Sequence, residues 1–188
     1  MPIASEVDIC NAALAAIGER PVASLEETGE AARLLALRYV PVRDAVLRAH
    51  PWNFALGRAL LQPLADAPAF GFARAYGLPT DCLRVVEAGA PPAPWRVEAR
   101  RVLTDEGPPL PLLYVRAATE TGLYDPLFVE ALAARLAADL ALRLTENAAR
   151  AATLWEVYQA KLREARQVDG REGTADDLPV GSWLEAHR

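Results

Sequence analysis

The chain has 188 residues, of which 52% are hydrophobic and 24% charged, with a formal net charge of −5. This balance is that of a globular domain large enough for one core, and no run approaches the ~18 consecutive apolar residues of a membrane-spanning helix. Acidic and basic residues are interspersed, so the sequence lacks the concentrated basic surface that binds nucleic acid through its phosphates.

The N-terminus, MPIASEVDIC, has neither the basic start nor the apolar stretch of a signal peptide, so we expect the chain to stay in the cytoplasm where it is made. Ser5 followed by Asp8 predicts a helix start, because a side-chain oxygen can accept from the free amides of the first turn. Gly18 predicts the C-terminal end of this helix. The residues expected on the buried face are Cys10, Leu14 and Ile17.

A longer helical pattern runs from about 29 to 49. Pro41 lies inside it, and a kink or break is expected there, because proline has no amide proton and its ring clashes with the preceding turn. The apolar residues at three- and four-residue spacing are Leu35, Tyr39, Val42 and Val46.

The middle of the chain, about 70–120, has a sequence pattern typical of short strands and turns and not of helices. Short strands are predicted at 82–87 (CLRVVE), 95–98 (WRVE) and 112–117 (LLYVRA). They are separated by AGAPPAP and DEGPPLP, whose glycine and proline content excludes a helix. The sequence therefore predicts a small antiparallel β-module inserted between helices.

The clearest helix begins after Asp125, a capping residue, with Pro126 at its first position, and is expected to run to about Thr145. Asp139 and Arg143 are expected to form an exposed pair four residues apart. A further helix is expected over about 148–166. The predicted buried residues of these two helices are Phe128, Leu132, Leu136, Leu140, Leu154, Tyr158, Leu162 and Ala165.

The predicted fold class is α+β, mainly α: an antiparallel helical bundle with an inserted small antiparallel β-module and an extended C-terminal tail. One domain would cover 1–168, with the β-rich insertion at about 70–120, and 169–188 would form the tail. The tail is polar and acidic but contains the apolar run LPVGSWL at 178–184. It either docks on a partner, because aromatic anchors dominate interface energetics, or folds back on its own subunit. The candidate partner-binding residues are Leu178, Val180, Trp183 and Leu184.

The stretch HPWNF brings together His50, Pro51, Trp52, Asn53 and Phe54. A catalytic histidine needs a nucleophile or an orienting carboxylate, and the neighbouring sequence supplies neither at a suitable spacing. Pro51 would end the preceding helix, since the residue before a proline avoids helical geometry. The two aromatic residues would then enter the core, and the asparagine could cap a short following helix. We interpret the stretch as a structural motif.

No catalytic residue, metal site or cofactor is predicted. The sequence has no GxSxG, HExxH, P-loop or GxGxxG motif. Cys10 and Cys82 lack CxxC spacing, which argues against a zinc ribbon or a disulfide framework and favours buried reduced thiols. Three adjacent acidic pairs lie in predicted loops or the tail, where solvation is the expected state: Glu26–Glu27, Asp105–Glu106 and Asp176–Asp177.

Several stretches in order resemble one family. They are ICNAALAAIG at 9–18, PVASLEE at 21–27, RYVPVRDAVLRAHPWNFA at 38–55, AYGLPTDCLRV at 75–85 and YDPLFVEALAARLAADLA at 124–141. Together they resemble the tail tubular protein A family, the head–tail connectors or adaptors of short-tailed phages and related prophages. The proline-rich β-region and the tail depart from the family pattern.

The resemblance implies a structural subunit of the virion, made in the host cytoplasm and without a membrane. Such subunits form a ring, usually dodecameric, that binds the portal protein and supports the tail or nozzle protein. DNA passes through the ring without sequence-specific binding. The residues 50–54 would then hold the fold.

Two other functions are kept as alternatives. A tail-associated cell-wall hydrolase would use a loop carboxylate such as Glu27 as its acid. A small helical protein-binding regulatory module would form a defined small oligomer and no ring.

Overall fold

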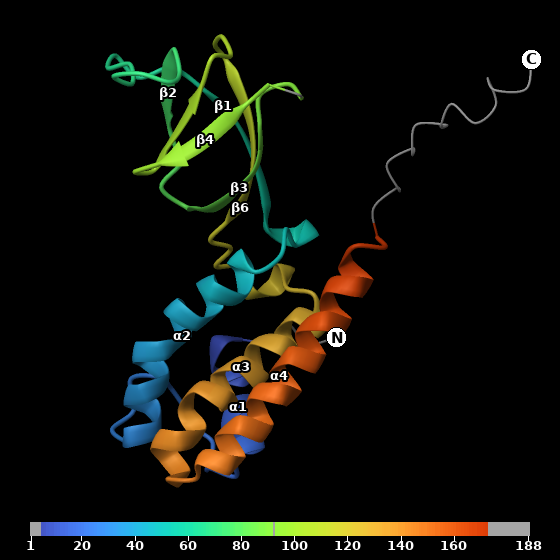
Figure 1. The fold of residues 1–188 in the computed structure, drawn as a ribbon. Helices are drawn as coiled ribbons and strands as arrows, with labels where there is room; N and C mark the ends of the chain where they lie inside the picture. The colour runs from blue at the N-terminus through green and yellow to red at the C-terminus, as the bar shows by residue number, and fades with distance from the viewer. Residues whose placement is uncertain (1–4, 92, 173–188) are drawn as a thin grey trace, which may run out of the picture.

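A computed structural model describes residues 5–91 and 93–172. The described chain is α+β, with four α-helices and two small antiparallel three-stranded sheets (Figure 1). The helices are α1 (Glu6–Ile17), α2 (Glu30–Arg48), α3 (Pro126–Thr145) and α4 (Ala148–Asp169). The strands are β1 (Leu56–Leu61), β2 (Arg74–Gly77), β3 (Cys82–Ala88), β4 (Trp95–Glu98), β5 (Arg101–Thr104) and β6 (Leu110–Arg116). Two short 3-10 helices cover Asn53–Ala55 and Thr121–Leu123.

The predicted helix ends are confirmed where a capping side chain fixes them. The Ser5 hydroxyl accepts from the Asp8 amide, and the Asp8 carboxylate accepts from the Ser5 amide, which forms a complete capping box. Helix α1 ends at Gly18, which adopts the left-handed conformation with φ of 88°. Helix α3 begins with Asp125 as cap and Pro126 in its first turn. These ends depend on local chemistry and are therefore readable in the sequence.

Helix α2 does not break at Pro41, contrary to expectation. The helix continues through it to Arg48. Pro41 is exposed, whereas Tyr39 and Val42 on either side are buried in the core. Tertiary packing of the buried face on both sides of the proline outweighs the loss of one internal hydrogen bond.

The helical part is built around α3, which packs against each of the other three helices. Helices α3 and α4 lie side by side in Figure 1 and are joined by a tight turn, in which Glu146 has a positive φ of 53° and Asn147 caps α4. The pairing of Asp139 with Arg143 is wrong: Asp139 instead accepts from Arg38 of α2, with Nε to Oδ2 at 2.6 Å. A pair between helices ties α2 to α3, which no single-helix pattern predicts.

The β part sits at one end of the helices (Figure 1). One sheet has the order β1-β6-β3 and the other β2-β5-β4, all pairs antiparallel. The β-region begins at Leu56 and not near 70, so the expected boundary is wrong. The sequence of β1, LGRALL, contains good helix formers, and its strand state comes from pairing along its whole length with β6.

A second apolar core fills the β part. It contains the fully buried ring of Tyr76, whose hydroxyl donates to the Glu106 carbonyl at 2.7 Å. Gly57 in β1 pairs with Tyr114 in β6, and a Cβ on Gly57 would come within 2.7 Å of the tyrosine ring. Only glycine fits under that ring.

We therefore expect Gly57→Ala to lower the free energy of unfolding by about 1–3 kcal/mol, because the methyl group would overpack the β core. Urea denaturation followed by circular dichroism measures the change. Gly107→Ala is the matched control, since no heavy atom lies within 4 Å of an added Cβ there. Equal effects of the two substitutions would contradict the close approach of the Tyr114 ring.

Candidate functional site

The stretch 50–54 lies at the corner where α2 ends and β1 begins. The last turn of α2 closes at Arg48, and Ala49 forms its cap ahead of Pro51. Trp52 turns back into the helical core, is fully buried, and donates from Nε1 to the Val46 carbonyl at 3.1 Å. This bond satisfies a carbonyl near the end of the helix and fixes the direction of the turn.

A residue from the far end of the chain completes this corner. Asp169 is the last residue of α4, and its side chain is 7% exposed. Its Oδ2 lies 2.9 Å from Nε2 of His50, and its Oδ1 accepts from the Asn53 amide at 3.0 Å. The Asn53 side chain donates in turn to the Asp169 carbonyl at 2.9 Å. We call this set of bonds the Asp169 junction.

Arg166 adds a further bond from the same helix, since its guanidinium donates to the Ala49 carbonyl at 2.9 Å. Two residues one turn apart on α4 therefore bond three residues of the corner, which are Ala49, His50 and Asn53. Because a carboxylate only accepts, Nε2 of His50 is the nitrogen that donates. The Asp169 junction thus consumes one ring nitrogen of His50 and both carboxylate oxygens.

Aromatic rings pack beneath these polar bonds. The ring of His50 meets Trp52 edge-on with centroids 4.8 Å apart, and Trp52 meets Phe128 of α3 at 5.1 Å. Phe54 lies 4.9 Å from the same Phe128 and 5.5 Å from Tyr124. Edge-to-face pairs of this kind stabilise by about 0.5–1.5 kcal/mol beyond the area they bury. The corner is therefore fixed to α3 as well as to α4.

The predicted motif residues 50–54 lie in one structural cluster. Two residues of α4 that the sequence analysis did not include, Arg166 and Asp169, belong to the same cluster. Asp169 was assigned to the tail, yet it ends α4. It supplies the carboxylate that the neighbourhood of His50 lacks, from 119 residues away. Only the three residues of α4 beyond the expected end at 166 would have signalled it.

Asn53 has a different role from the one expected. No α-helix follows it, and the 3-10 turn at Asn53–Ala55 has no side-chain cap. Its side chain bonds Asp169 instead. Chemically, a histidine–carboxylate pair can orient a general base, but here the carboxylate also binds the Asn53 backbone, which is the pattern of a structural link.

One residue of each described acidic pair accepts a backbone hydrogen bond. Glu27 accepts from the Ala23 amide at 2.8 Å, and Asp105 accepts from the Ala73 amide at 2.7 Å. Asp176 and Asp177 lie outside the described residues. Within the described ranges, no group of three or more His, Cys, Asp or Glu side chains is arranged to hold a metal ion.

The two cysteines are free thiols buried in the two cores. Burial raises the pKa of the Cys10 thiol to about 12, with a smaller contribution from Glu6. Burial also raises the pKa of Cys82, although Arg100 opposes it. Both thiols therefore stay protonated and unreactive at neutral pH.

No protein-family model matches this chain, and no curated protein matches it in sequence. None of the helices in the described ranges is long and apolar enough to cross a membrane.

The Asp169 junction gives a direct prediction. Asp169→Ala should lower the free energy of unfolding by at least about 1.5–3 kcal/mol, the usual contribution of a hydrogen bond to a charged group. Because His50→Ala removes the same bond, the double variant should cost less than the sum of the single variants by about 0.5–3 kcal/mol. Urea denaturation of the four proteins measures this coupling.

Asp66→Ala, in the exposed loop between β1 and β2, is the control and should leave the free energy of unfolding nearly unchanged. Strict additivity of Asp169→Ala and His50→Ala would show that the two side chains do not interact.

Proposed function

We propose that this chain is a structural subunit, a head-to-tail connector that forms a ring below the portal, extends the DNA channel and supports the tail. The observation that carries the proposal is the Asp169 junction. The run at 38–55, one of the stretches that resemble the connector family, joins the helical part to the β part. A structural subunit needs its parts held in fixed relative positions, and the Asp169 junction holds the helical part and the β part together in this way.

The finer architecture belongs to the same proposal. The four helices would act as the antiparallel bundle of such a subunit, with the β part as a second contact surface. The fold supports this because the helical and β parts have separate cores and are joined at the corner. Each surface could then meet a different neighbour without disturbing the other core.

The charge of the chain suits a DNA channel. Every cationic contact to phosphate releases counterions and would retain the passing DNA. The subunit carries 25 acidic and 20 basic residues, for a net charge of −5. A ring of such subunits, usually a dodecamer in the resembled family, would let DNA pass without sequence-specific binding.

The partner contact of the C-terminal region is also part of the proposal. Leu178, Val180, Trp183 and Leu184 would bind the portal or a neighbouring subunit, with Trp183 as the anchor. These residues lie outside the described residues.

Co-expression with the portal protein encoded near this chain, followed by negative-stain electron microscopy of the purified product, tests the proposal. Stacked rings, with this chain forming a collar under the portal, are expected. Bare portal rings, with this chain left in the soluble fraction, would overturn it. A defined small oligomer that forms no collar would favour a regulatory module.

A truncation tests the partner contact. The chain ending at Glu172 keeps Asp169 and its bonds to the corner, so a loss of binding reports on the removed residues alone. We expect the amount of chain recovered with portal rings to fall strongly for this truncated chain and for the full chain with Trp183→Ala. Full recovery of the truncated chain would exclude the C-terminal contact. Trp155→Ala, an exposed tryptophan on α4, is the matched control.

A further inference from the structure

An open hollow of about 240 Å³ lies where the end of α2 meets the β part. We call it the waist hollow. It is formed by the last turn of α2, by β3, by β4 and by the turn after β4. The residues that matter for its chemistry are Arg48, Leu83, Arg84, Trp95, Val97 and Arg100.

The rim of the waist hollow is basic. It carries three arginines, Arg48, Arg84 and Arg100, and no acidic side chain lines it. Asp81 lies beside Cys82 of the same region and accepts from the Tyr114 hydroxyl at 3.3 Å. Arg48 donates to the Leu83 carbonyl, and Arg100 donates to the Pro79 carbonyl at 2.7 Å. A guanidinium has five N–H donors, so both arginines keep donors for an incoming carboxylate.

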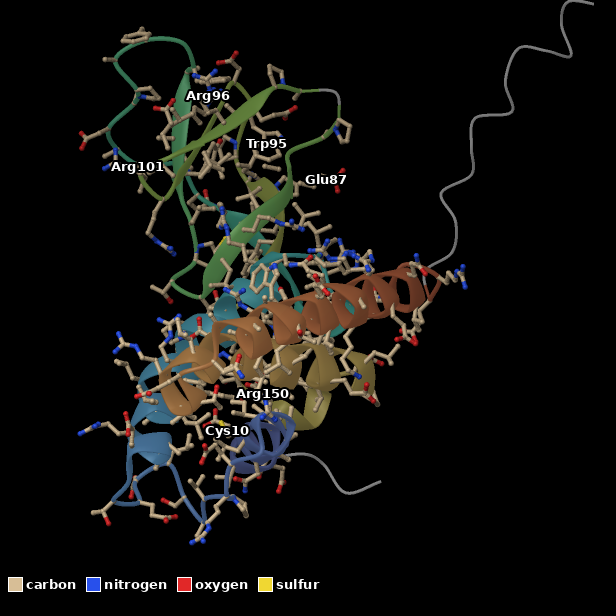
Figure 2. The ribbon with its side chains drawn as sticks, turned by 60° about the horizontal axis from the view of Figure 1, so that its bottom comes forward. Cys10, Glu87, Trp95, Arg96, Arg101 and Arg150 are labelled. Atoms are coloured by element: carbon tan, nitrogen blue, oxygen red, sulfur yellow. The ribbon has the colours of Figure 1, made fainter. Side chains whose placement is uncertain are left out.

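The floor of the waist hollow is apolar. Trp95 and Val97 project from the same face of β4, because side chains alternate along a strand, and both are accessible, Val97 to 43%. Figure 2 shows Trp95 in the β part, apart from Arg101, which lines a different hollow on the opposite face of this sheet. An apolar floor under a basic rim fits a peptide that is acidic and also carries large apolar side chains.

We propose that the waist hollow binds residues 173–188 of the same chain. That segment has Asp176, Asp177 and Glu185 against a single arginine, Arg188, so its charge complements the rim. Its large apolar side chains complement the floor; they are Leu178, Val180, Trp183 and Leu184.

The segment begins close to the waist hollow. Asp169 is bonded to His50, which is two residues along the chain from Arg48 on the rim. Asp176 is four residues beyond Glu172, a reach of at most about 14 Å at ~3.5 Å per residue. The contact therefore needs no second copy. It is a property of the free chain, independent of the proposed function, and any partner that takes the segment must first displace it.

A spin label on the full-length chain tests this contact. A nitroxide attached to Ala186→Cys, with the buried Cys10 and Cys82 left in place, should remove most of the amide signal of Leu83, Trp95 and Val97 in ¹⁵N spectra. Amides of α1, at the far end of the helical part in Figure 1, should keep their signal. Unchanged signals at the waist hollow would overturn the proposal. Wild-type chain treated with the same reagent controls for labelling of the native thiols.

Charge variants establish the cause. Asp176→Asn with Asp177→Asn, and separately Arg84→Gln, should each restore most of the lost signal, as should high salt. Arg101→Gln on the opposite face should not. Signal loss that persists in both charge variants would overturn the proposal. Signal loss that appears only when spin-labelled chain is mixed with a separate ¹⁵N chain would also overturn it, because the segment would then come from a second copy.

Discussion

The structure depends on one buried carboxylate. Asp169 at the end of α4 binds the His50 ring and the Asn53 backbone, and through them it holds the corner between α2 and β1. A buried carboxylate is costly unless its hydrogen bonds are complete. Here both oxygens have partners, so the cost falls on arrangements that keep Asp169 buried but move His50 or Asn53 away from it. The junction therefore makes the relative position of the last helix and the β part specific.

The corner also connects two cores that would otherwise be independent. Trp52 belongs to the helical core, and only a few residues later Gly57 pairs with Tyr114 in the β core. The chain returns from β6 to the helical part through Val115 and Ala118, both buried with the helices. Two short connections, the first of them bonded to Asp169, position the β part.

Arginine side chains donate to several carbonyl groups that lie between the helices and strands. Arg100 reaches the carbonyls of Pro79, Thr80 and Cys82, and Arg166 reaches Ala49 across elements. A planar guanidinium with several donors can satisfy two or three carbonyls at once, which an ammonium cannot do in the same geometry. The same groups leave a positive rim at the waist. Structural arginines thus create a surface that an acidic segment can use.

The sequence by itself determined the features that depend on local chemistry. The capped ends of α1 and α3, the buried faces of the four helices apart from the half-buried Leu154, and the strands at 82, 95 and 112 follow from caps, proline and periodicity. It also indicated that residues 50–54 form a structural corner. Tertiary structure decided what local preference leaves open: the strand state of LGRALL, the unbroken helix at Pro41, the partner of Asp139 and the role of Asp169. Each depends on a contact with a residue far along the chain, and no local pattern encodes such a contact.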